Sequence, residues 1–135
     1  MNATLETALL GLLLFEIKHY LADFVFQTLG QVQAKGHYGR WGGISHAGLH
    51  ALMSLPALLV LTATADLFDI PRTLPLIAAV MLAEFAVHYH IDYAKARIDR
   101  GFGWDVADQE YWIVFGTDQF LHQMTYWVIV WWMVR

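Results

Sequence analysis

Four long apolar segments, separated by three shorter polar connections, dominate the chain. The segments cover residues 5–28, 44–65, 74–95 and 111–134, and most glycine and aspartate lies between them. A hydrocarbon core about 30 Å thick is crossed by roughly 20 residues of helix, so each segment is long enough to span a bilayer. Pro56 should kink the second segment. The pattern predicts an all-α fold in which residues 1–135 form one domain, an integral membrane bundle of four transmembrane helices.

Each apolar segment nevertheless contains two ionisable residues spaced four positions apart. They stand in the stretches "HYLAD", "HAGLH", "HYHID" and "DQFLH", and the pairs are His19 with Asp23, His46 with His50, His88 with Asp92, and Asp118 with His122. Residues i and i+4 lie on one face of a helix, one turn apart. Each pair therefore presents two side chains toward a common centre.

The four pairs also share one depth in the predicted bundle. Neighbouring helices run antiparallel, so pairs late in the first and third segments and early in the second and fourth fall in the same half. At 1.5 Å rise per residue, they lie between roughly 3 and 16 Å from the end that holds the first and third connections. The opposite half contains only apolar stretches such as "TALLGLLLF" and "LPLIAAVML". We expect all eight side chains to meet at one buried polar cluster.

Composition supports a membrane protein and narrows the chemistry. Hydrophobic residues make up 58% of the chain and charged residues only 15%, which departs from the soluble average. The chain has no cysteine, so disulfides and thiolate metal ligands are excluded. The net charge of -4 comes without a basic run, which argues against nucleic acid as a partner.

The distribution of lysine and arginine predicts the orientation. Five of these residues lie in or beside the first and third connections (Lys35, Arg40, Lys95, Arg97 and Arg100), whereas the other side has only Arg72 and Arg135. Lysine and arginine concentrate on the cytoplasmic side of membrane proteins. The polar cluster is therefore expected in the cytoplasmic half, with both termini extracytoplasmic.

Imidazole and carboxylate groups gathered in an apolar interior point to a bound cation. Buried carboxylates without a counter-charge cost several kcal/mol each, and Lys95 is the clearest nearby cation in the sequence. This ligand set suits zinc first, with iron or manganese as alternatives. The predicted ligands are His19, Asp23, His46, His50, His88, Asp92, Asp118 and His122. Haem bound by two of the histidines is the alternative cofactor.

Three residues are candidates for catalytic roles beside such a metal. Glu84, one turn deeper than His88, would act as a general base or orient a ligand. Lys95 would hold an anionic group of a substrate. Asp23 would complete a second metal or position the attacking water.

These motifs resemble those of a family of small prokaryotic integral membrane proteins, domain of unknown function 3307. The family pattern joins His-x-x-x-Asp-Phe and a following Gln, His-x-x-x-His, His-x-x-Ile-Asp-x-x-Lys and Asp-Gln-x-x-His. The corresponding stretches here are "HYLADFVFQ", "HAGLH", "HYHIDYAK" and "DQFLH". The resemblance implies a location in the prokaryotic inner membrane. The family is also similar in style to proteins named membrane-bound metal-dependent hydrolases. In "HAGLH", Ala47 replaces the glutamate base of H-E-x-x-H peptidases, so that class is not indicated.

Three interpretations remain open from the sequence. The first is a metal-dependent hydrolase that acts on a small-molecule or lipid substrate at the cytoplasmic leaflet. The second is a non-catalytic metal or haem protein that carries, transports or senses its ligand. The third is a bundle whose polar contacts are purely structural. Membrane lipid is the expected surrounding partner, and homo-oligomerisation stays open.

Overall fold

The computed structural model describes residues 3–63 and 70–134, and every regular element in these ranges is a helix. The elements are α1 (Ala3–Tyr20), the π-helical turn η1 (Leu21–Val25), α2 (Leu29–Lys35), α3 (Trp41–Met53), α4 (Leu55–Ala63), α5 (Ile70–Phe102) and α6 (Gln109–Met133). The all-α prediction is confirmed. Residues 64–69, the side chain of Arg72 and residue Arg135, which entered the predicted boundaries and orientation, lie outside the described part of the chain.

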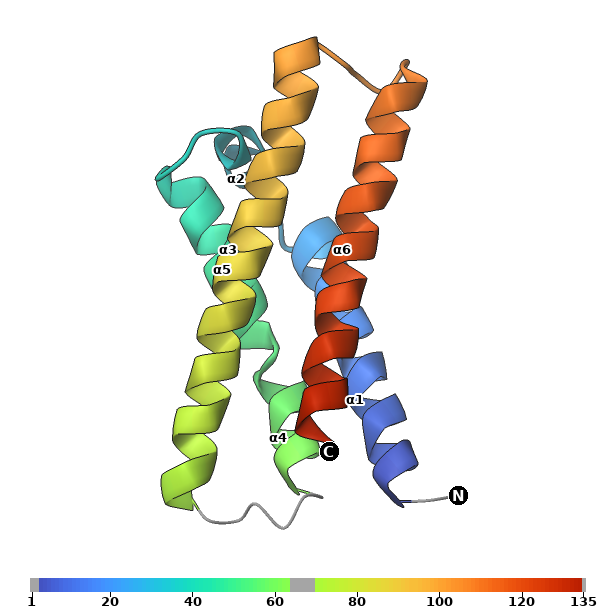
Figure 1. Ribbon diagram of the computed structural model, residues 1–135. Coiled ribbons are helices and arrows are strands. Elements are labelled where there is room, and N and C mark those ends of the chain that lie inside the picture. Colours follow the sequence, from blue (N-terminus) through green and yellow to red (C-terminus); the bar gives the residue numbers. More distant parts are fainter. Residues whose placement is uncertain (1–2, 64–69, 135) are drawn as a thin grey trace.

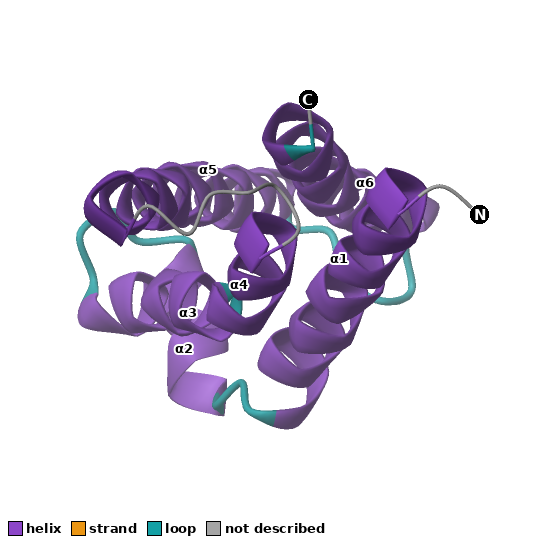
Figure 2. Ribbon diagram, turned by 90° about the horizontal axis from the view of Figure 1, so that it is seen from below, coloured by secondary structure: helices purple, strands orange, loops and turns teal. Residues whose placement is uncertain are grey.

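The long helices run up and down along one bundle axis. The short helix α2 and the α5–α6 connection lie at one end, called here the connection end, and the start of α1 and the end of α6 lie at the other, called here the terminal end (Figure 1). Seen from the terminal end, α4 lies between α1 and α5 (Figure 2). This arrangement puts the predicted first and third connections at the same end.

An apolar core fills the terminal end of the bundle. Its buried members are Phe15, Ala57, Leu58, Leu61, Ile77, Val80, Tyr126, Val130 and Met133. Phe15 and Tyr126 stack with ring centres 4.9 Å apart. α1 and α4 approach closely at Gly11, where an added Cβ would lie 2.7 Å from a methyl carbon of Leu61. The expectation that this half consists of apolar packing is met by these residues.

The helix of the second apolar segment is interrupted next to Pro56. α3 ends at Met53 and α4 begins at Leu55, one residue before Pro56. Proline has no backbone N–H to donate to the carbonyl four residues earlier, which breaks the regular ladder. Ser54 lies between the two helices and bonds back to the end of α3. Its Oγ donates to the His50 carbonyl at 3.0 Å, and its N–H donates to the same oxygen at 3.1 Å.

Some boundaries differ from the predicted ones. The first helical segment ends at Val25 rather than at residue 28, and the first connection contains α2. Thr28 and Gln31 form a capping box that starts this short helix. The third helix continues to Phe102 rather than ending at residue 95, so part of the expected third connection is helical.

Two helical stretches of the described chain are long and apolar enough to cross a membrane, Trp41–Ala63 and Thr73–Phe102. The first crosses the break between α3 and α4. α1 and α6 do not reach the same apolarity, because α1 carries Glu6, Glu16 and Lys18 and the middle of α6 is polar. The four predicted spans are thus reduced to two by this measure, and a four-span topology stays a prediction.

Candidate metal centre

The eight predicted ligands converge in the interior, on the connection side of the apolar core. His19 and Asp23 come from α1 and η1, His46 and His50 from α3, His88 and Asp92 from α5, and Asp118 and His122 from α6. All of them except Asp23 are buried as whole residues, and the Asp23 side chain is only 7% exposed. Four helical segments therefore supply one polar layer, called here the His/Asp cluster.

Three ligand atoms in this cluster form a nearly equilateral triangle. The Nε2 atoms of His46 and His88 lie 3.4 Å apart, and Asp92 Oδ2 lies 3.4 Å from the first and 3.3 Å from the second. Hydrogen bonds from N–H to O are usually 2.7–3.2 Å long, so these contacts are long for hydrogen bonds. Ligand atoms bound tetrahedrally at 2.0–2.1 Å from zinc lie about 3.3–3.4 Å apart. The triangle has the dimensions of one face of such a site.

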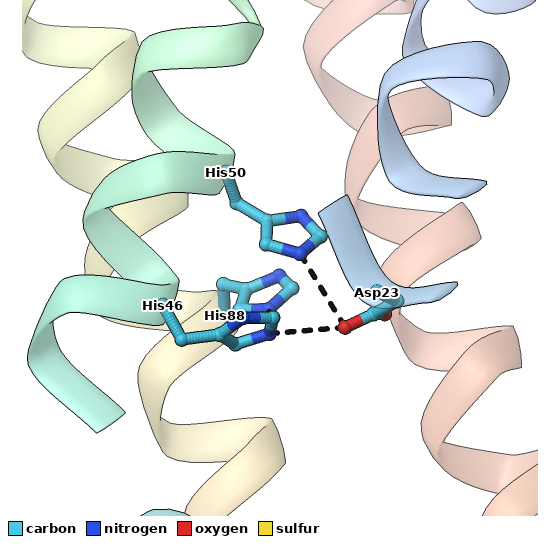
Figure 3. A group of neighbouring side chains, drawn as sticks. All are labelled: Asp23, His46, His50 and His88. Carbon is cyan, nitrogen blue, oxygen red and sulfur yellow. Dashed lines mark hydrogen bonds and ion pairs between the residues drawn. The ribbon is translucent and has the colours of Figure 1, made fainter. Parts of the chain in front are cut away.

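Asp23 approaches this face from the opposite side of the bundle. Its Oδ1 lies 2.9 Å from His46 Nε2 and 3.4 Å from His50 Nε2 (Figure 3). The ligand atoms of Asp23, His46, His50 and His88 all lie within 4.8 Å of one another. This group draws on three separate elements, so it exists only in the folded bundle.

A second group of ligand atoms overlaps the first at His88. It consists of His88, Asp92 and His122, again with all three atoms within 4.8 Å of one another. His122 Nε2 lies 3.7 Å from Asp92 Oδ1 and 3.5 Å from Asp118 Oδ1. Asp118 thus borders the second group through His122.

His19 lies at the edge of the cluster rather than in either group. Its Nε2 is 3.3 Å from Asp23 Oδ2 and 3.0 Å from Gln119 Oε1, and its Nδ1 is 2.9 Å from the Tyr126 hydroxyl oxygen. These contacts satisfy both ring nitrogens. His19 therefore holds Asp23 in place more directly than it offers a free ligand atom.

The π-helical turn positions the carboxylate of Asp23. In η1, the Phe26 N–H bonds to the Leu21 carbonyl at 2.8 Å, five residues back, so one extra residue is accommodated in the turn. Gln27 follows and donates from Nε2 to Asp23 Oδ1 at 3.0 Å. Single π-turns inside helices occur frequently at functional sites.

Several buried polar atoms in the cluster have no hydrogen-bond partner among the described residues. His50 Nε2 and His122 Nε2 are fully buried atoms of this kind, as is Asp118 Oδ1. Leaving a buried polar atom unsatisfied costs about 1–3 kcal/mol. A cation would satisfy imidazole nitrogen and carboxylate oxygen at once, and the geometry therefore forms groups that could hold a metal ion.

Two lysines neutralise part of the charge of the cluster: Lys18, which the sequence offered as a second cation beside Lys95, and Lys35, which it did not indicate. Lys35, on α2, places its Nζ 3.1 Å from Asp92 Oδ2 and 3.5 Å from Asp23 Oδ1. Lys18 forms a buried ion pair with Glu84. Lys95, expected to be the nearest cation, instead pairs with Asp99 at 2.9 Å.

The remaining histidines lie outside the cluster. His90 is exposed, and its Nε2 is 3.1 Å from the Tyr38 hydroxyl oxygen. His37, in the first connection, is also exposed and lies 2.9 Å from Arg100 Nη1. The guanidinium of Arg100 holds the pKa of His37 below its usual value.

Sequence reasoning missed Lys35, Gln119 and Tyr126 as neighbours of the predicted ligands. Two of them carried a signal. Gln119 follows Asp118 directly, and Tyr126 stands four residues after His122, on the same helix face. Lys35 carried none, because its place depends on how α2 folds back.

A comparison with known proteins places the chain in a family. No curated protein and no solved structure matches it. One family model matches residues 9–135, which include all eight cluster residues. The chain therefore belongs to the family described as protein of unknown function (DUF3307), as its four motifs had indicated.

Proposed function

We propose that the protein is a membrane-embedded metalloprotein that binds one divalent transition metal, with zinc as the first candidate, and uses it for hydrolysis. The observation that carries the proposal is the triangle of His46, His88 and Asp92, whose ligand atoms are spaced 3.3–3.4 Å apart. Asp23 would supply the fourth ligand from the facing helix, with His50 and His122 beside it. Imidazole and carboxylate without thiolate also fit iron or manganese.

Charge balance favours a single divalent ion. Four carboxylates meet in this layer (Asp23, Glu84, Asp92 and Asp118), whereas only two ammonium groups, those of Lys18 and Lys35, contact them among the described residues. With neutral imidazoles, two negative charges remain. Uncompensated buried charge costs several kcal/mol, and one divalent cation would cancel it.

The location in a membrane is supported by the surface of the molecule. Large apolar side chains are exposed on every long helix, such as Leu13 on α1, Leu82 on α5 and Trp131 on α6. The interior, by contrast, holds His, Asp, Glu and Lys. Such a distribution suits a lipid solvent, because apolar side chains face the hydrocarbon and ionisable ones face the bundle interior. The inner-membrane location and the extracytoplasmic termini belong to the proposal.

Hydrolysis is favoured over transport because a polar cavity adjoins the cluster, whereas buried apolar side chains close its terminal side. A polar cavity of about 170 Å³ borders the cluster and is lined by Asp23, Asp92, Asp118, Lys35 and Lys95 among others. On the terminal side, Phe15, Leu58 and Leu61 are at most 1% exposed and close the interior. A site that borders a cavity and is closed on the terminal side suits a substrate that enters and leaves without crossing the bundle.

The metal would act as a Lewis acid and lower the pKa of a coordinated water. The reaction needs water alone: its oxygen bonds to the electrophilic carbon or phosphorus, the bond to the leaving group breaks, and the leaving group takes up the proton. Asp118, whose Oδ1 is unsatisfied and which lines the polar cavity, is placed to receive that proton first.

Glu84 and Lys95 take different parts in this proposal. Glu84 pairs with Lys18, whose Nζ lies 3.5 Å from His50 Nδ1, so Glu84 orients a ligand histidine through Lys18. Lys95 lines the polar cavity and holds an anionic group there. Haem fits less well, because the rings of His50 and His88 stack with centres 3.7 Å apart and leave no space for a porphyrin between them.

The test is metal content of the protein purified in detergent without chelator. We expect about one zinc, iron or manganese per chain, lost in His88→Ala and retained in His90→Ala, which removes an exposed histidine from the same helix. Added zinc should raise the melting temperature of the wild type but not of His88→Ala. A metal-free protein whose melting temperature ignores zinc, iron and manganese would refute the metal centre. Metal without hydrolysis of aryl phosphate or carboxylate esters would leave a binding protein and refute the hydrolase.

A further inference from the structure

A long apolar groove runs along the outside of the bundle between α5 and α6. Two adjoining hollows of about 530 and 400 Å³ form it, and they share Val87, Ile91 and Leu121 as lining residues. Residues 83–98 of α5 line it, a length of roughly 22 Å at 1.5 Å per residue. This exceeds half of a hydrocarbon core about 30 Å thick.

Small side chains keep this groove open. Ala83, Ala86 and Ala94 of α5 line it, where larger residues would fill the space against α6. Most other lining residues are also apolar, including Ile98, Val114 and Val128. The groove therefore suits a hydrocarbon chain.

The groove leads to the His/Asp cluster at its connection end. Lys95 and Asp118 line both the groove and the polar cavity described above, so the groove and the polar cavity share a wall. The polar cavity in turn reaches Asp92 and Lys35. A molecule that lay in the groove would place its end at this shared wall, beside the metal ligands.

The charge at this junction selects the polar end of such a molecule. The Lys95 ammonium lies 4.7 Å from the centre of the Tyr111 ring. Among the described residues, Asp99 is the carboxylate with which it forms an ion pair. Lys35 stands on the other side of the cavity, against Asp92. When Asp23 and Asp92 bind the metal, the Lys35 ammonium loses its two carboxylate partners and can pair with an anion in the cavity.

We propose that this groove binds a membrane lipid with an anionic phosphate headgroup, which enters sideways from the bilayer between α5 and α6. The acyl chain lies along Val87, Ile91 and Leu121, and the phosphate reaches Lys95 and Lys35 at the junction. The inference rests on the proposed function, because it names the substrate class of the same site. The proposal adds an entry from the bilayer between α5 and α6. A substrate dissolved in water would not need this entry.

The experiment uses the full-length protein in nanodiscs that contain phosphatidic acid with a photoreactive diazirine in its acyl chain. We expect cross-links to concentrate on the groove residues of α5 and α6. Ala86→Leu should reduce them by about tenfold, which corresponds to about 1.4 kcal/mol of binding free energy. Ala79→Leu, an exposed position of α5 outside the groove lining, should leave them unchanged.

The headgroup is tested in the same system. Lys95→Ala should lower the labelling, whereas Arg97→Ala, an exposed cation one half-turn away, should not. Equal labelling by phosphatidylcholine, or displacement by inorganic phosphate as effective as by unlabelled phosphatidic acid, would overturn the anionic-lipid assignment. Cross-links spread evenly over the outer surface, or joining α5 and α6 to a second copy of the chain, would overturn the groove as a lipid site. Labelling is repeated with chelator and metal content is measured in parallel. Groove labelling without bound metal would therefore refute the proposed function alone.

Discussion

The ion pair of Lys18 and Glu84 shows how single charges are accommodated inside this bundle. The two side chains are 5% and 2% exposed, and they come from α1 and α5. Lys18 Nζ also lies 4.5 Å from the centre of the Tyr126 ring and donates to the His50 carbonyl at 3.4 Å. The ammonium therefore has partners in three directions, whereas Glu84 Oε2 has none among the described residues.

Removing one member of this pair should destabilise the protein strongly. Glu84→Leu leaves the Lys18 ammonium buried without its carboxylate, at a cost of about 3–5 kcal/mol. The double variant Lys18→Met with Glu84→Leu should recover most of that loss, because the remaining groups are apolar. Unfolding in detergent with increasing denaturant measures the free energies. A double variant as unstable as the single one would contradict this account of the pair.

For single residues, the predicted ligands could be found from the sequence, whereas the pairing of each lysine with a particular carboxylate could not. The pairs at i and i+4 are visible within single helices, so His88 with Asp92 could be found from spacing alone. Lys18 and Glu84 are 66 positions apart, and Lys35 and Asp92 are 57 apart. Helical periodicity carries no information on such contacts, which arise only when the helices pack.

Among the elements, α2 matters most for the cluster, because it carries Lys35. Its start was marked in the sequence by Thr28 and Gln31, the two ends of a capping box. The π-turn η1 had no such mark, since "LADFV" is compatible with an ordinary helix. The break before α4 was predictable from Pro56. The effect of Pro56 was thus predicted, whereas the capping signal at Thr28 was overlooked and the extra residue in η1 depends on tertiary packing.

The docking of α2 on α3 should be sensitive to a single methyl group. A Cβ at Gly42 would lie 2.6 Å from Ala34 Cβ and 2.9 Å from the Gly30 carbonyl oxygen. Gly42→Ala should therefore push α2 away, at a cost of about 1–3 kcal/mol, and separate Lys35 from Asp92. Limited proteolysis with trypsin should show faster cleavage after Lys35, together with a lower melting temperature.

Gly48→Ala is the matched control on the same helix. Its added Cβ would lie 4.0 Å from Phe85 Cε2, an ordinary contact. Replacement of a helical glycine by alanine is favourable by about 0.5–1 kcal/mol when the site has room. Equal trypsin sensitivity of the two variants would show that α2 is not held by the close approach at Gly42.

For the whole molecule, the polar interior and the apolar exterior are the features that composition and periodicity predicted best. His46, His50 and His88 are at most 2% exposed, whereas Leu52 and Leu82 are more than 60% exposed. A soluble bundle would have the reverse distribution. The four polar faces could be predicted to converge because antiparallel helices bring equal depths together. α5 and α6 each carry one carboxylate and one histidine of the cluster. Of these two helices, only α5 is apolar enough to cross a membrane by length and composition.

The last prediction concerns how the whole chain lies in a membrane. Lys35, Arg40, Arg97 and Arg100 gather at the connection end, and this excess of positive charge is expected on the cytoplasmic side. Because the chain has no cysteine, single cysteines report sidedness cleanly. Gly101→Cys, at an exposed position with open space around it, should react with a membrane-impermeant maleimide only after the cells are opened. A peptide tag joined to the C-terminus should instead be accessible from outside the inner membrane. Access to both from the same side would contradict the crossing by α6, and a simple exchange of the two results would reverse the orientation while leaving the bundle intact.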